Sequence, residues 1–187
     1  HLWWIWNTEE YKWEIIDETD ILNRVAKIST INTIKFRDKN EIVEALKQVG
    51  RLNKPANPEP NWLQFRDKIV DIKTYKIFPA NSKYLITNPI PHAIGIKEDT
   101  PVIDKLFEDW VGKDNINDLY EIIAFCMVPD YFIHRIICFT GGGSNGKTTF
   151  LKLIKKTIDN NNVTSTELDS LIDSRFESAK LYKKLVC

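Results

Sequence analysis

The feature that most constrains this chain is a glycine-rich loop at residues 138–150, Cys-Phe-Thr-Gly-Gly-Gly-Ser-Asn-Gly-Lys-Thr-Thr-Phe. Gly141, Gly146, Lys147 and Thr148 match the phosphate-loop pattern G-x-x-x-x-G-K-[ST]. In proteins with this motif the loop connects a strand to a helix, so it predicts a strand before residue 141 and a helix after residue 147.

Both flanks of the loop have the composition that this arrangement requires. Residues 135–140, Arg-Ile-Ile-Cys-Phe-Thr, are apolar and β-branched, which predicts a buried strand. Residues 148–158 place Phe150, Leu151, Ile154 and Ile158 at helical spacing, which predicts an amphipathic helix. The alternative, a flexible Gly/Ser/Asn linker, is disfavoured because linkers are not usually held between a buried strand and an amphipathic helix.

The chemistry follows from the residue types. Glycines allow backbone N–H groups to turn toward a phosphate, and a helix N-terminus adds partial positive charge. Lys147 is expected to reach the β- and γ-phosphates and the Thr148 hydroxyl to hold Mg²⁺, so these two are the candidate catalytic residues. The predicted nucleotide-binding set is Gly141, Gly142, Gly143, Ser144, Asn145, Gly146, Lys147, Thr148 and Thr149. The expected cofactors are ATP and Mg²⁺.

Composition indicates the general class of protein and its setting. The chain has 187 residues, a formal net charge of zero and 43% hydrophobic residues, which is ordinary for a soluble globular protein of one large or two small domains. Cys126 and Cys138 lie in apolar surroundings and are expected to pack in a core, which fits a reducing intracellular setting. No membrane-spanning run or signal peptide is visible. Because the chain starts at His1 and not at Met, we expect a fragment of a larger protein.

Residues 1–96 are predicted to form a mixed α+β adaptor domain. Runs 2–6 and 11–16 predict a hairpin rich in tryptophan, with Trp3, Trp4, Trp6 and Trp13. These rings could stack on the bases of single-stranded nucleic acid, but cross-strand aromatic packing is the favoured interpretation.

Two short helices and a meander complete this predicted domain. The first helix is capped by Asp17 or Thr19; the second starts at a capping box of Asp38 and Glu41 and ends at Gly50. The pair could belong to a DNA-binding module, with plain helical packing the favoured alternative. After the proline-rich connection 54–60, a candidate subdomain boundary, short strands are predicted at 62–65, 69–72, 75–78 and 84–87.

Residues 97–132 form a predicted helical segment, with helices at 100–111 and 115–128. Thr100 caps the first helix, Gly112 ends it, and the second ends before Pro129. Residues 133–187 are the predicted ATPase core, with a short strand at 163–166, a short helix at 167–172 and, at 176–187, a helix leading into a strand. His92 and His134 are expected to be structural or surface residues.

Two motifs resemble a known family. The loop at 140–150, with Asn145 directly before Gly146 and Lys147, resembles the Walker A motif of superfamily 3 helicases of the poxvirus and phage or plasmid primase-helicase types. The stretch 84–91, Tyr-Leu-Ile-Thr-Asn-Pro-Ile-Pro, is similar to a Y-x-T-N-x-[IL]-P segment upstream of their ATPase domain.

The resemblance implies an adaptor followed by the start of an AAA+-like α/β P-loop ATPase, truncated before the Walker B strand. The family implies a viral or plasmid replication protein: a hexameric, ATP-driven helicase that acts on single-stranded or forked DNA, with a possible upstream primase domain. It would lie in the host cytoplasm or at a viral replication site, with no membrane. The Walker B carboxylates, the sensor asparagine and the arginine finger would follow Cys187, so we expect negligible ATP hydrolysis by these residues alone.

Two other functions remain open. Residues 1–130 could serve as a DNA-binding or protein-docking adaptor, with contacts from Trp3, Trp4 and Trp6 or from the basic residues at 47–54. The loop could also belong to a different P-loop enzyme, such as a small-molecule kinase. That alternative is disfavoured because about 140 residues precede the loop here, whereas such kinases usually carry it near the amino terminus.

Overall fold

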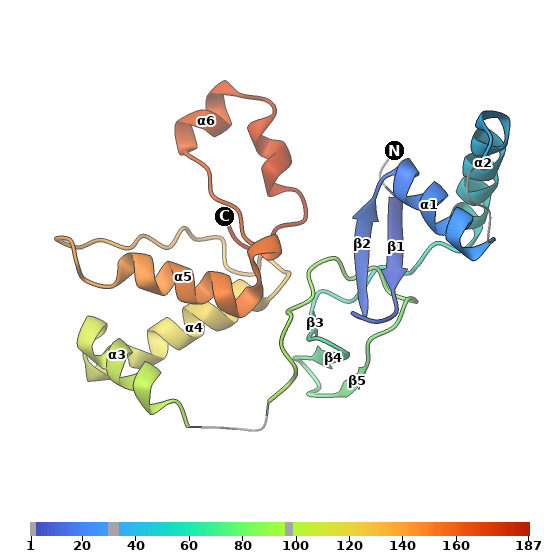
Figure 1. The fold of residues 1–187 in the computed structure, drawn as a ribbon. Helices are drawn as coiled ribbons and strands as arrows, with labels where there is room; N and C mark the ends of the chain where they lie inside the picture. Colours follow the sequence, from blue (N-terminus) through green and yellow to red (C-terminus); the bar gives the residue numbers. More distant parts are fainter. Residues whose placement is uncertain (1–2, 30–33, 96–98) are drawn as a thin grey trace. The chain divides into compact units, whose positions relative to one another are not determined.

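The computed structural model describes residues 3–29, 34–95 and 99–187 as a mixed α+β chain with two small antiparallel sheets and several helices (Figure 1). The chain divides into two compact units. One contains the residues up to Pro58 together with Asn81–Thr87, and the other contains Glu59–Ala80 and Asn88–Cys187. The first change of unit lies inside the proline-rich connection 54–60, whereas the border predicted at 96/97 falls outside the described residues.

The first unit contains the tryptophan hairpin. Strands β1 (Trp3–Asn7) and β2 (Lys12–Ile16) pair antiparallel with Trp6 opposite Trp13, which confirms the hairpin prediction for the described residues. The two indole rings pack edge to face with centroids 5.7 Å apart, and the Trp13 indole N–H donates to the Tyr84 carbonyl at 2.7 Å. This is the cross-strand packing that the aromatic content favoured.

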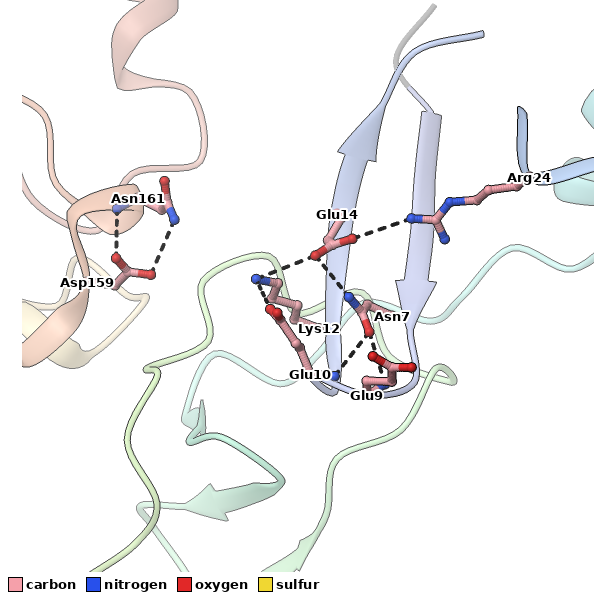
Figure 2. Close-up of polar contacts among 8 residues, drawn as sticks. All are labelled: Asn7, Glu9, Glu10, Lys12, Glu14, Arg24, Asp159 and Asn161. Carbon is pink, nitrogen blue, oxygen red and sulfur yellow. Dashed lines mark hydrogen bonds and ion pairs between the residues drawn. The ribbon is translucent and has the colours of Figure 1, made fainter. Parts of the chain in front are cut away.

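A single asparagine organises the hairpin turn, as Figure 2 shows. The Asn7 side-chain oxygen accepts hydrogen bonds from the N–H groups of Glu9 and Glu10, at 3.0 and 3.1 Å. Its Nδ2 donates to the Glu14 carboxylate across the hairpin at 3.1 Å. The other Glu14 oxygen lies 3.7 Å from the Arg24 guanidinium, so helix α1 is joined to the sheet by charge.

Helix α1 (Glu18–Ile28) begins as its sequence predicts. The Asp17 side chain accepts from the Asp20 N–H at 2.8 Å, and the Asp20 carboxylate accepts in return from the Asp17 N–H at 3.5 Å. This reciprocal capping box satisfies two of the N–H groups that a helix start leaves unpaired.

Helix α2 (Phe36–Leu52) differs from its prediction at both ends. It begins before Asp38, with Lys35 as the N-cap residue, so Asp38 and Glu41 lie within the helix and form no capping box. It also continues past Gly50. A glycine inside a helix costs only about 1 kcal/mol, and the helix ends at Asn53, whose backbone and side-chain N–H groups both donate to the Val49 carbonyl at 3.0 Å.

The second unit contains the sheet β3 (Trp62–Gln64), β4 (Lys68–Asp71) and β5 (Ile77–Pro79), antiparallel in that order. The fourth strand predicted at 84–87 is wrong. Within the first unit, Tyr84 makes only an isolated parallel bridge with Ala56, and its carbonyl accepts the Trp13 indole N–H. The Ala56 N–H donates to the Lys83 carbonyl and the Leu85 N–H donates to the Ala56 carbonyl, whereas the Ile86 N–H turns back to the Tyr84 carbonyl, so the pairing does not continue as a ladder.

Three helices of the second unit share one core. They are α3 (Pro101–Val111), α4 (Ile116–Met127) and α5 (Lys147–Ile158), and all three were predicted (Figure 1). Gly112 ends α3 with φ +81°, and α4 ends before Pro129. A short 3-10 helix η1 (Lys113–Asn115) connects α3 to α4. The buried residues of this core are Phe107, Leu119, Phe150, Ile154 and Ile158.

The strand predicted at 135–140 is wrong. The segment is extended but pairs with no described strand, and Ile136 is 86% exposed. A β-strand needs a neighbour to satisfy its backbone groups, and β-propensity alone does not supply one. Consequently Cys138 and His134 are also exposed, so the core position expected for Cys138 is wrong.

The last residues form short elements. Helix α6 (Leu168–Asp173) was predicted, but the helix expected after residue 176 is only the 3-10 helix η3 (Glu177–Leu181). The predicted strand at 163–166 is reduced to one parallel bridge between Val163 and Val186. The 3-10 helix η2 (Asn160–Asn162) follows α5 and is held by Asp159, whose carboxylate accepts from Asn161 (Figure 2). None of the helices in the described ranges is both long and apolar enough to span a bilayer.

Candidate phosphate-binding loop

The loop between residue 140 and α5 has a backbone that favours glycine. Gly143 and Gly146 have φ of +97° and +84°, in the left-handed region that residues with a Cβ rarely adopt. Ser144 between them also has a positive φ, +47°. Main-chain anion sites are built where turns that include left-handed residues direct successive backbone N–H groups toward one side.

The backbone N–H groups of the loop are free donors. Residues 141–149 donate no backbone hydrogen bond to any described residue, and the first bond of α5 runs from the Phe150 N–H to the Gly146 carbonyl at 2.8 Å. A helix N-terminus leaves such donors unpaired, and its dipole favours a negative charge beside them. The loop thus offers an anion a run of donors that ends in a helix start.

The lysine of the motif bends back toward the loop. Lys147 Nζ donates to the Gly141 carbonyl at 3.1 Å and to the Asn145 side-chain oxygen at 2.6 Å. A Cβ built on Gly141 would overlap the Asn145 side-chain amide, so that amide lies directly against Gly141. The ends of the Asn145 and Lys147 side chains therefore lie against the loop, and neither residue is buried.

The donor set fits an anion. Residues 138–150 contain no Asp or Glu, and the loop supplies N–H groups, the Lys147 ammonium and the exposed Thr148 and Thr149 hydroxyls. In the described part of the chain no group of three or more His, Cys, Asp or Glu side chains could hold a metal ion. The Thr148 hydroxyl is the residue of this loop that could hold a Mg²⁺ ion, together with oxygens of the phosphate itself.

No protein-family model matches this sequence, and no curated protein matches it.

The far end of α5 is held by a residue that the sequence did not single out. Asn162 is 3% exposed, and its Nδ2 donates to the Ile158 carbonyl at 2.6 Å and to the Pro89 carbonyl at 3.1 Å. Asn88 Nδ2 donates to the Asn162 side-chain oxygen at 3.3 Å and to the Lys183 carbonyl at 2.5 Å. The sequence signal was an asparagine one turn past the helix end, where side-chain amides can satisfy free carbonyls.

His92 also makes a contact at the C-terminal end of α5. Its Nε2 lies 3.0 Å from the Lys156 carbonyl in the last turn of α5, while the side chain remains exposed. His92 thus contacts the last turn of α5, and Asn88 and Pro89 bond to Asn162 just beyond the helix. This agrees with a packing role for His92.

A second missed residue lies at the other end of α5. A Cβ built on Gly146 would overlap the indole ring of Trp110, so that ring lies directly against the last glycine of the loop. Its helical spacing from Ile103 and Phe107 places Trp110 in the apolar stripe of α3. No periodicity could have placed it beside residue 146, because the contact joins elements 36 positions apart.

The residues of the adaptor hypothesis lie in the first unit. Trp4 and Trp6 are half-buried in the hairpin, and Trp3 has a buried indole N–H with no partner in the described part of the chain. Lys47 donates to the Glu44 carboxylate at 2.7 Å, whereas Arg51 is exposed at the end of α2.

Proposed function

We propose that residues 141–149 bind the triphosphate of ATP with Mg²⁺. The observation that carries this proposal is the run of free backbone N–H groups in a left-handed glycine loop that leads directly into α5, with Lys147 at its end. Anion binding at such a loop needs no other special device.

Each residue has a role that its position supports. Lys147 Nζ exchanges the Gly141 carbonyl and the Asn145 amide for β- and γ-phosphate oxygens, and so neutralises charge that develops on the γ-phosphoryl group. The Thr148 hydroxyl is one oxygen ligand for Mg²⁺. The bound Mg·ATP supplies the phosphoryl group and its activation; the chain orients it.

We further propose that the loop belongs to a hexameric replication helicase, the ATPase that moves along DNA in a primase-helicase. The support is that the two family-like motifs lie at opposite ends of α5. The loop with Asn145 begins α5, and Asn88 and Pro89 of the 84–91 stretch bond to Asn162 just beyond its end. The helicase activity, the DNA substrate and the hexamer are parts of this proposal, as are an AAA+-like ATPase core and an upstream primase domain.

Equilibrium binding of Mg·ATP tests the first step. Isothermal titration calorimetry compares the wild-type chain with Lys147→Ala and with Lys152→Ala, an exposed lysine of the same helix outside the loop. Lys147→Ala should weaken binding by at least about tenfold, equivalent to about 1.4 kcal/mol, and Lys152→Ala should leave it unchanged. Equal losses in both variants, or no binding by the wild type, would refute the nucleotide site.

Single-stranded DNA tests the second step. An oligonucleotide should change the affinity for Mg·ATP in the wild type, and the effect should fall steeply with salt because phosphate contacts release counterions. An affinity for Mg·ATP that DNA does not change at any salt concentration would favour the kinase alternative. DNA binding that persists unchanged in Lys147→Ala, without any nucleotide binding, would favour the adaptor alternative.

A further inference from the structure

The ring of Trp110 occupies the space that a side chain on Gly146 would need. A Cβ built on Gly146 would overlap three atoms of the indole, Cε2, Nε1 and Cδ2. Two independent constraints therefore favour glycine at position 146: the backbone φ of +84°, and the indole ring that lies where a Cβ would be. The contact joins the last turn of α3 to the residue directly before Lys147.

Aromatic neighbours keep this ring in place. Its centroid lies 5.8 Å from that of Phe107, which is fully buried, and 6.3 Å from that of Phe150 at an interplanar angle of 85°. Phe150 in turn belongs to the first turn and a half of α5 and is 2% exposed. The Phe107 contact is tilted and the Phe150 contact is edge to face. Aromatic pairs favour particular ring orientations as well as burying area, so the two phenylalanines restrain the Trp110 ring.

We propose that Trp110 is a positioning residue for the nucleotide loop: it holds Gly146 in the left-handed conformation that turns the N–H groups before α5 toward a bound phosphate. This inference rests on the proposed nucleotide site and goes beyond it, since it assigns a role to a residue outside the motif. The ring blocks movement of Gly146 toward α3. Closure of the loop on a phosphate must then occur against Trp110, which links the helices α3 and α4 to nucleotide binding.

The experiment uses two readouts on the whole chain with Mg·ATP as the probe. Calorimetry measures affinity, and tryptophan emission measures any change around the indole. The variants are Trp110→Phe, Trp110→Ala and, as the matched control, Trp62→Phe in β3, whose ring packs on Phe78. Circular dichroism checks that each variant is folded.

In the wild type and in Trp62→Phe, Mg·ATP should change the tryptophan emission. In Trp110→Phe that change should be lost although binding persists, and affinity should fall only a few-fold because a smaller ring keeps part of the contact. Trp110→Ala should weaken binding by about tenfold. Should the alanine variant fail to fold, the emission of Trp110→Phe still decides the question.

The results that would overturn the inference are distinct from those that would overturn the nucleotide site. An emission change that survives in Trp110→Phe, or wild-type affinity in a folded Trp110→Ala, would remove the role of Trp110 and leave the nucleotide site intact. A wild-type chain that binds no Mg·ATP would remove both. A purely structural role would lower the thermal stability of Trp110→Ala without moving its affinity, and that outcome also counts against the inference.

Discussion

The two flanks of the phosphate loop have similar apolar content and opposite structures. On the C-terminal side, Phe150, Ile154 and Ile158 of α5 are 2%, 4% and 0% exposed. On the N-terminal side, Tyr131 and Ile136 are 70% and 86% exposed in an extended segment. The difference does not follow from hydrophobicity, since both flanks would gain from burial.

The difference follows from how each backbone satisfies its hydrogen bonds. A helix pairs its N–H and C=O groups within itself, so α5 forms and then buries one face against α3 and α4. A strand pairs only with a neighbour, and residues 136–140 have no backbone partner in the described part of the chain. Two edge-to-face contacts hold the segment, Phe132 on Phe125 and Phe139 on Phe150, and leave its middle exposed.

The largest expected effect is on the buried flank. Phe150→Ala removes a ring that contacts Phe107, Trp110 and Phe139, so it should lower the free energy of unfolding by about 3–5 kcal/mol. The neighbouring Leu151 is 52% exposed, and Leu151→Ala should cost less than about 1 kcal/mol. Urea unfolding followed by circular dichroism measures both. Similar losses in the two variants would mean that α5 does not bury the face seen here.

The next effect concerns the end of the same helix. Asn162→Ala leaves the carbonyls of Ile158 and Pro89 without the donor that they share, which should cost about 1–3 kcal/mol. Asn160 lies in the same turn but is exposed, so Asn160→Ala is the matched control and should change stability by about 0.5 kcal/mol or less. Thermal unfolding of both variants checks this. A neutral Asn162→Ala would show that water replaces the amide and that the site is open.

This difference between helices and strands also explains which elements could be predicted from the sequence. Helices α1, α3, α4 and α5 were predicted because their stripes, caps and stop residues are local signals. Glycine and lysine spacing singled out the candidate loop for the same reason. Strands at 84–87 and 135–140 were mispredicted because pairing depends on a distant neighbour, which local pattern does not encode. Asn162 and Trp110 were missed because their roles exist only across tertiary contacts.

The exposure of the N-terminal flank can also be tested without a mutation, by comparing the reactivity of its cysteine with that of a cysteine in the helical core. Cys138 is exposed in the N-terminal flank, whereas Cys126 in α4 is half-buried, and its burial raises the pKa of the thiol. The thiolate is the reactive form, so near neutral pH Cys138 should be alkylated at least about tenfold faster than Cys126. Raising the pH should narrow the gap, because Cys126 reaches its thiolate form only at higher pH. Mass spectrometry of tryptic peptides follows each site.

Exposed Cys187 serves as the internal reference for that experiment. Cys138 should react as fast as Cys187. Protection of Cys138 to the level of Cys126 would mean that the N-terminal flank is packed in solution, in which case the contrast between the flanks would fail.

The smallest expected effect gives the most direct test of the N-terminal flank. Ile136→Lys places a charge on a side chain that is 86% exposed, so the change in unfolding free energy should be about 0.5 kcal/mol or less. The matched substitution Ile154→Lys buries the same charge in α5 at a position that is 4% exposed, and it should prevent folding. Urea unfolding of Ile136→Lys is therefore informative in both directions. An unchanged unfolding free energy supports a segment that pairs with no strand although its sequence resembles one. A loss above about 2 kcal/mol is the size expected of a buried site, and it would place residues 135–140 in a sheet as their sequence predicts.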